Sequence, residues 1–160
     1  MSVFVCSLKT TQPQLIPADG QYHIVRFPFG GGESYDDHLM HQAAQPGGAP
    51  IADWASDDRS GLILPSVPGW GSLTAMLQWE DGDYTEVRDR FVRDPLGPAP
   101  DATATEDHAP TPGGQYLHKC HEMFVDPLVP LGLLVRHNAS WGRRITLAEF
   151  KLAIHPTEGV

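Results

Sequence analysis

Alternation of apolar and polar residues marks three segments of this chain as β-strands. The apolar sets are Leu73, Ala75, Leu77 and Trp79 in Ser72–Glu80; Leu131, Leu133 and Val135 in Leu131–His137; and Ala148, Phe150, Leu152 and Ile154 in Ile145–His155. Successive side chains of a strand point to opposite faces, so each segment is predicted to bury one face. Trp79 is therefore expected to lie in the core.

Weaker patterns predict further strands. These are Val3–Leu8, Tyr22–Phe29, Arg59–Pro65, Tyr84–Arg93 and Tyr116–Val125. Tyr84–Arg93 follows a D-G-D turn and is predicted to form a hairpin with Ser72–Glu80, although Val87 and Phe91 also have helical spacing. Roughly eight strands without a long helix are typical of an all-β antiparallel sandwich or barrel.

The remaining segments are irregular. A short helix is predicted at Asp36–Ala44, because its apolar residues have helical spacing. The stretches 42–58 and 94–114 are predicted to be long loops of a single domain spanning residues 1–160. A loop as long as 94–114 is unusual in a compact domain, so it is expected to be mobile, to wrap a neighbouring subunit or to link two domains. The flanking pieces are too small to fold separately, which favours one domain.

The segment Gln14–Phe27 joins a turn to a strand. Pro17 restricts φ, and Asp19-Gly20 supplies a turn with a residue that tolerates positive φ. The extended part carries Tyr22, Val25 and Phe27, which we expect to pack in the core or at a subunit contact and to take part in no reaction. The segment is also expected to pair with Ala148–Ile154 or to lie near it.

The composition narrows the classes of partner. The net charge is −9, and an acidic surface repels phosphate, so nucleic acid and anionic membranes are not expected partners. Glycine (16) and proline (15) together make up about a fifth of the chain, less than in a disordered protein and more than in a helical one.

The cysteines and the apolar runs of the chain indicate the cellular compartment in which it is made. Cys6 and Cys120 are expected to be free, buried thiols in strands, although one disulfide between them is an alternative. The first residues lack the pattern of a signal peptide, and no apolar run is long enough to span a membrane. Synthesis in a cytoplasm is therefore expected.

An ordered set of short motifs resembles a known family. It comprises Q-x-I-P-x-x-G-x-Y-x-x-V-x-F at Gln14–Phe27, D-D-H-x-M-H at Asp36–His41, the strand pair within Arg59–Trp79, the strands Val87–Arg93 and Leu131–His137, and A-E-F-K-L-A-I at Ala148–Ile154. This order resembles the jelly-roll β-sandwich of the C1q and tumour-necrosis-factor (TNF) type, in the version found in bacteriophage virion proteins. One departure is P-G-W-G at 68–71, where such domains usually carry G-x-Y, and it affects local packing.

The resemblance implies a compact homotrimer around a threefold axis. In phages, such domains are implied to serve as capsid decoration proteins, head fibres or tail-associated proteins. The family transfers no catalytic residue, so none is expected here, and no cofactor is implied.

The sequence contains three groups of potential metal ligands. His38 and His41 lie beside Asp36 and Asp37; His118, Cys120 and His121 form a second group; and Glu80, Asp81 and Asp83 form an acidic turn. In a strand, residues 118 and 120 share one face whereas residue 121 points away, which leaves too few ligands. The acidic turn lacks the ligand spacing of a calcium loop. Solvated turns are the favoured interpretation, and no metal site is predicted.

Motifs for nucleophilic or phosphate chemistry are missing. G-W-G-S at 69–72 places its serine wrongly for a nucleophile elbow, and Gly30-Gly31-Gly32 is not a dinucleotide fingerprint. Asp57-Asp58 is a pair of adjacent acids whose side chains point apart, which does not suit acid–base catalysis.

Four aromatic residues are the candidate interface residues. These are Trp54, Trp70, Trp141 and Tyr22. The three tryptophans are expected in loops or turns, where each either contacts a partner or folds back over its own core.

The function hypothesis that follows is a non-enzymatic bacteriophage structural protein. It would be a trimeric decoration protein of the virion, bound to the major capsid protein or another virion protein and stabilising the assembled shell. The alternative is a receptor- or carbohydrate-binding module of a tail or fibre. A small cupin-like metal enzyme is a third hypothesis, although the cupin motif is not recognisable.

Overall fold

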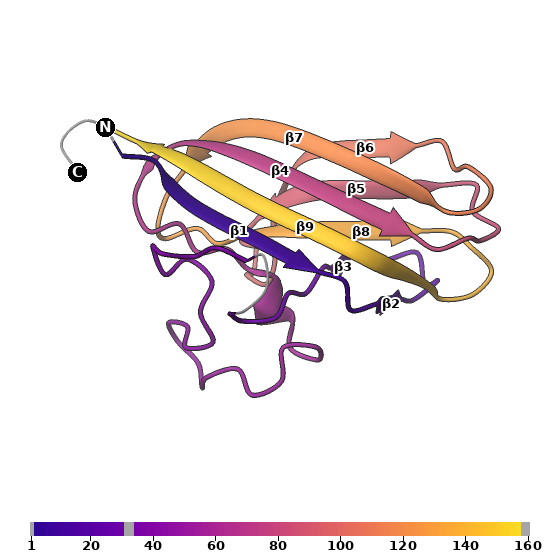
Figure 1. Cartoon of the computed structure of the whole chain (residues 1–160), viewed down its shortest axis with the longest axis horizontal. Helices are drawn as coiled ribbons and strands as arrows, with labels where there is room; N and C mark the ends of the chain where they lie inside the picture. The colour runs from indigo at the N-terminus through magenta and orange to yellow at the C-terminus, as the bar shows by residue number, and fades with distance from the viewer. Residues whose placement is uncertain (1, 31–33, 158–160) are drawn as a thin grey trace.

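Two antiparallel sheets packed face to face make up the protein (Figure 1). The computed structural model describes residues 2–30 and 34–157. The strands are β1 (Phe4–Thr10), β2 (Gln14–Ile16), β3 (His23–Ile24), β4 (Gly69–Trp79), β5 (Val87–Arg93), β6 (Asp101–His108), β7 (Gln115–Val125), β8 (Leu131–His137) and β9 (Arg143–Pro156). The first sheet has the order β1-β9-β4-β7, with β2 also pairing with β9, and the second has the order β3-β8-β5-β6.

The core lies between the sheets, as the alternation predicts. All three predicted apolar sets are buried, and Trp79 is 1% exposed. At the centre, Phe91 of β5 stacks on Phe150 of β9, with ring centroids 5.8 Å apart, and Phe27 lies 6.3 Å from Phe150. Fully burying a large apolar side chain contributes about 1.5–3 kcal/mol, so this aromatic cluster is a main source of stability.

The two ends of the sequence lie together in the first sheet. β1 pairs with β9 from Phe4 opposite Ile154 to Thr10 opposite Ala148. β2 pairs with the beginning of β9, with Gln14 opposite Ile145. The expected neighbourhood of Gln14–Phe27 and Ala148–Ile154 is thus confirmed, although β1 is the direct partner of the latter. The predicted turn is confirmed too, since Gly20 has φ +73°.

The hairpin predicted between Ser72–Glu80 and Tyr84–Arg93 is wrong. β4 pairs with β7 and β9, whereas β5 lies in the opposite sheet and pairs with β6 and β8. The chain crosses between the sheets after Trp79, where the Tyr84 hydroxyl donates to the Glu80 carbonyl. Alternation identifies a strand, but it carries no information about which sheet the strand joins.

A strand occupies the middle of the segment predicted as a loop at 94–114. β6 forms the edge of the second sheet, and its side chains are exposed or half-buried. Its sequence, D-A-T-A-T-E-D-H, has no large apolar residue, so it has no alternation to recognise. A short polar edge strand also resists pairing with other chains.

Two further expectations differ from the structure. Asp36–Ala44 forms turns instead of a helix, because the Asp36 carboxylate accepts the amides of Met40 and His41 at 2.7 and 2.8 Å and competes with helical bonding. Arg59–Pro65 is a 3-10 turn, η1 (Asp58–Gly61), followed by one bridge from Ile63 to Leu131.

Only His23–Ile24 of the predicted strand Tyr22–Phe29 is paired as β3. The next residues remain extended, and the Val25 amide donates to the Leu133 carbonyl at 2.9 Å. Val25 and Phe27 are buried in the core as expected. Among the described residues, no helix is long and apolar enough to cross a membrane.

Candidate interaction surface

An aromatic pair lies on the outward side of the first sheet. Trp70 of β4 is directly opposite Phe124 of β7, and the two side chains are 50% and 47% exposed. Trp70 is also opposite His155 of β9. Trp70 was predicted as an interface residue in a turn, and the structure places it on a strand; Phe124 was not predicted.

The rest of this surface carries few charges. We define the β4–β7 face as the outward side chains of the two strands: Trp70, Ser72, Thr74, Met76, Gln78, Tyr116, His118, Cys120, Glu122 and Phe124. Tyr116 is 64% exposed at the other end of the face from the aromatic pair. The alternation of Tyr116–Val125 contains the signal for Phe124 and Tyr116, because both fall on the face opposite the buried Leu117 and Met123.

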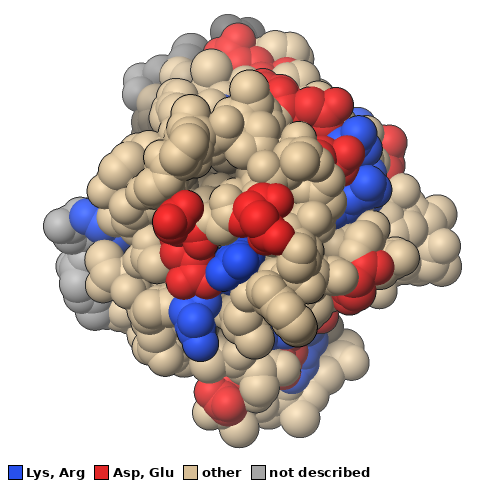
Figure 2. Space-filling model, turned by 90° about the vertical axis from the view of Figure 1, so that its right-hand side faces the viewer, with Lys and Arg blue, Asp and Glu red and all other residues tan. Residues whose placement is uncertain are grey.

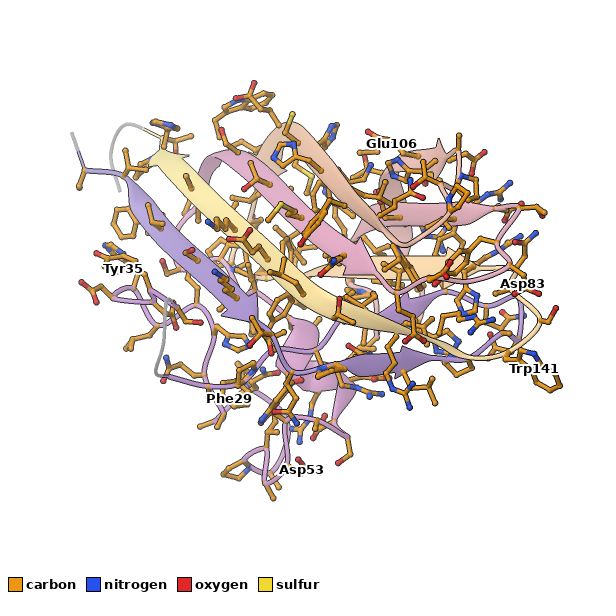
Figure 3. All side chains as sticks on the ribbon, turned by 45° about the vertical axis from the view of Figure 1, so that its right-hand side comes forward. Phe29, Tyr35, Asp53, Asp83, Glu106 and Trp141 are labelled. Atoms are coloured by element: carbon orange, nitrogen blue, oxygen red, sulfur yellow. The ribbon has the colours of Figure 1, made fainter. Side chains whose placement is uncertain are left out.

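Trp141 lies at a different end of the molecule, in the turn between β8 and β9 (Figure 3). Its side chain is 73% exposed. The turn is held by Asp83, which accepts the Ser140 amide at 3.0 Å and contacts the Ser140 hydroxyl and Arg143. Hydrogen bonds from Ser140, followed by Arg143, lower the pKa of Asp83 to about 2. A fixed turn therefore presents this tryptophan to solvent.

Charges at this end are paired. Figure 2 views the molecule from the right-hand side of Figure 1 and shows acidic and basic groups side by side between wide uncharged areas. Glu86 bridges Arg88 and Arg136 at 3.1 and 2.9 Å. No extended patch of one sign is visible from this side.

Trp54 covers part of its own chain. It is half-buried and lines a hollow of about 230 Å³ together with Leu15 and Arg26. Its carbonyl accepts the Ser60 hydroxyl at 2.7 Å, and Arg26 binds the neighbouring Ala55 carbonyl and Asp58. Trp54 thus lies against its own chain beside a surface hollow, and its role at an interface stays a prediction.

Tyr22 is also engaged within the chain. The guanidinium carbon of Arg90 lies 3.6 Å from the centroid of its ring, and that of Arg136 lies 5.7 Å away. This geometry is a cation–π contact. The structure therefore brings none of the four predicted interface residues together: Trp70 lies on the first sheet, Trp141 at the end of the sandwich, Trp54 beside the hollow near Leu15, and Tyr22 against Arg90.

The histidines of the first metal hypothesis have structural roles. His41 is buried, stacks on Phe29 and pairs with the Ser60 carbonyl through Nε2 at 2.7 Å. Burial lowers its pKa. His38 packs against the ring of Phe4, and Asp36 is occupied by backbone amides.

The second group, His118, Cys120 and His121, behaves as the strand geometry predicts. His118 and Cys120 are exposed on the β4–β7 face, whereas His121 points away and lies 3.2 Å from the Thr103 hydroxyl. Both cysteines are free, as expected; Cys6 is buried, but Cys120 is exposed, which corrects that part of the prediction. Burial raises the pKa of the Cys6 thiol.

One cluster of chemically active side chains was missed. Asp89 of β5 and Glu106 and His108 of β6 place ligand-type atoms within 4.8 Å of one another, and Lys119 of β7 contacts both carboxylates. The sequence contains a signal for this cluster, namely charged residues at inward positions of two strands. Asp89 lies between Val87 and Phe91 on the inward face of β5, and Lys119 falls in the inward set of β7.

Comparison with known proteins supports the fold. No protein-family model and no curated protein matches the sequence. Among solved structures, the chain is similar to Eiger TNF from S. frugiperda, with 10% identity, a TM-score of 0.59 and full coverage of both chains. It is also similar to murine APRIL at pH 8.0, with 9% identity, a TM-score of 0.62 and coverage of 96% of this chain and 100% of that one. The antiparallel jelly-roll β-sandwich of the TNF/C1q-like type is thereby shown to be the fold of this chain.

Proposed function

We propose that this protein is a non-enzymatic structural protein that assembles as a homotrimer through the β4–β7 face and decorates a bacteriophage capsid. The observation that carries self-association is the exposed aromatic pair Trp70 and Phe124 on a sheet face that carries few charges. Side-by-side exposed aromatics in a chain of net charge −9 are the kind of surface that another protein covers.

A second copy of the chain is the favoured occupant of this face. The TNF/C1q-like fold and the virion-protein resemblance of the motifs support a threefold arrangement. A stable contact needs about 800 Å² from each partner, and β4 and β7, each 11 residues long, form a continuous surface on this side of the first sheet. Ser72 and Glu122 are already paired through a hydrogen bond at 3.0 Å, so these two polar groups need no new partner in a contact.

Light scattering of the purified chain at micromolar concentration tests the assembly. We expect the mass of a trimer, and a shift to monomer in the double variant W70S/F124S. Trp141→Ser is the matched control, because it removes an exposed tryptophan away from the β4–β7 face and should leave the trimer intact. A monomeric wild-type protein would contradict the proposal.

The capsid role is tested separately. Genes for a major capsid protein and its protease beside this gene would favour decoration, whereas tape-measure and baseplate genes would favour a tail. Co-sedimentation with shells assembled from the neighbouring capsid protein is the direct assay, and we expect binding to assembled shells that raises their melting temperature. A trimer that does not bind these shells would contradict the capsid role but not the proposed trimer.

A receptor- or carbohydrate-binding module of a tail or fibre is the second candidate. It is favoured by Trp141, an exposed indole on a turn fixed by Asp83, since a pre-organised aromatic loses little freedom on binding. Binding on a glycan array that disappears in Trp141→Ala would favour this function over decoration.

A further inference from the structure

Four ionisable side chains meet between the two sheets, at the edge where β6 and β7 approach each other. Figure 3 labels Glu106 at this edge. Lys119 Nζ lies 3.1 Å from Asp89 Oδ1 and 3.2 Å from Glu106 Oε1. His108 Nε2 lies 2.6 Å from the other oxygen of Asp89, Oδ2.

Asp89 and Lys119 are deeply buried, with side chains that are each 2% exposed. Lys119 Nζ lies 5.7 Å from the centroid of the Phe91 ring, so apolar core borders the pair. The contact between Nζ and Oδ1 does not have the angular geometry of a hydrogen bond. An ion pair held in this way recovers little of its desolvation cost, and apolar side chains of the same size would usually be more stable.

A covalent bond removes that cost. We propose that Lys119 and Asp89 condense to an intramolecular amide, with Glu106 as the catalytic proton-transfer group. Lys119 Nζ lies 3.1 Å from an oxygen of the carboxyl group whose carbon it would attack, and burial of both side chains limits competing hydration of the pair. The reaction modifies the chain itself and turns over no substrate.

The step balances without any co-reactant. A proton passes from the Lys119 ammonium to the Asp89 carboxylate, which gives a neutral amine and a neutral acid. The nitrogen lone pair then attacks Cγ of Asp89, and a C–N bond forms as the C=O electron pair moves to oxygen. Glu106 takes one of the two protons left on the nitrogen and passes it to the hydroxyl group, which leaves as water when the C–O bond breaks, and the last proton stays on the amide nitrogen.

The two neighbours of the reacting pair have distinct roles. Glu106 Oε1 touches the nitrogen, and its side chain is 46% exposed, which connects the site to solvent for the departing water. A carboxylate oxygen only accepts, so His108 donates through Nε2 to Asp89 Oδ2. That hydrogen bond stabilises negative charge on the oxygen as the tetrahedral intermediate forms.

The bond would join strands of different sheets. Asp89 belongs to β5 in the second sheet and Lys119 to β7 in the first, and no hydrogen-bonded ladder connects these two strands. A covalent link at this edge would prevent the sheets from separating there. By limiting the unfolded chain, it would also stabilise the fold as a disulfide does.

Intact-mass spectrometry of the purified full chain is the test. We expect the mass of the wild-type protein to be lower than the sequence mass by one water. Proteolysis should yield one branched peptide that joins the segment containing Asp89 to the segment containing Lys119. A folded wild-type protein that keeps its full mass after long incubation would overturn the proposal.

Matched variants assign the roles. Glu106→Gln keeps the shape of the side chain but cannot accept the proton, so the folded variant should keep its full mass. Asp89→Asn should form the same amide with loss of ammonia in place of water. Lys151→Arg, which alters an exposed lysine on β9, should react as the wild type does, whereas Lys119→Arg should not react. Loss of water in Lys119→Arg would overturn the assignment, and circular dichroism confirms that each variant is folded.

Discussion

The space between the two sheets is filled in two different ways. At its centre, Phe27, Phe91 and Phe150 pack ring against ring without a polar atom. At the β6–β7 edge, the same space holds Asp89 and Lys119, each 2% exposed and bordered by Glu106 and His108. Apolar burial stabilises the first region directly, whereas the second must neutralise its buried charges, either by pairing them or, in the reaction proposed above, by joining them as an amide.

The contrast separates two parts of the interior. The centre is specified by the apolar alternation of the sequence, and the edge is specified by the charged partners of each buried group. A large apolar side chain fits the centre as long as volume is kept. At the edge, removing one partner leaves a buried charge alone. We therefore expect the centre to respond to changes in volume and the edge to respond to changes in pairing.

The largest effect is expected at the centre. Phe150→Ala removes the ring that contacts both Phe27 and Phe91, and it should lower the free energy of unfolding by about 3–5 kcal/mol, because a cavity remains. Urea unfolding measures the change. The control is Lys151→Ala on the neighbouring exposed position, which should stay within about 0.5 kcal/mol of wild type. Equal losses in the two variants would show that β9 does not pack as described.

The edge should show non-additivity. In the Glu106→Gln background, where amide formation is blocked, Lys119→Met leaves Asp89 buried without its cation and should cost about 3 kcal/mol. Adding Asp89→Leu should restore most of that stability, since the pair is then replaced by apolar side chains. A double variant as unstable as the sum of the single changes would mean that the two groups are not coupled, and the contrast with the centre would disappear.

The centre could be predicted from the sequence, and the edge could not. The alternation of β4, β8 and β9 identifies the residues that are buried, because the apolar effect acts through residue type and spacing. Pairing between strands depends on the path of the chain, so the position of β5 in the opposite sheet was missed. The polar edge strand β6 was missed because its sequence contains no large apolar residue.

Strand pairing, which the sequence does not reveal, also decides which residues form the candidate surfaces. Trp70 was recognised as an exposed aromatic, but its partner Phe124 is 54 positions away and meets it only through the pairing of β4 with β7. Tyr22 was expected at a core or subunit contact, and the structure covers it with Arg90, which lies on a strand of the same sheet. Likewise, Asp89 and Lys119 each stand out on an inward face, and only the packing of the two sheets makes them a pair.

His137 offers a third case, a buried polar group satisfied in its neutral form, and its response to pH separates it from the charged edge. Its Nε2 donates to the Ile16 carbonyl at 2.8 Å, and its Nδ1 accepts from the Ala139 amide at 3.1 Å; the ring also packs edge-on against Trp79 and Tyr84. Protonation of Nδ1 would break the second bond, and burial lowers the pKa of His137 below the usual 6.5.

Because the unfolded chain then binds more protons than the folded chain below about pH 6.5, acidification from pH 7.5 to 5.5 should lower the free energy of unfolding. The buried His41 acts in the same direction, since its pKa is also lowered. Urea unfolding at the two pH values should therefore show a smaller loss of unfolding free energy in His137→Gln than in wild type. Part of the loss should remain because of His41. A loss as large in His137→Gln as in wild type would mean that this ring does not titrate with folding. The contribution of His137 to stability would then be independent of pH, as it is for the apolar side chains at the centre.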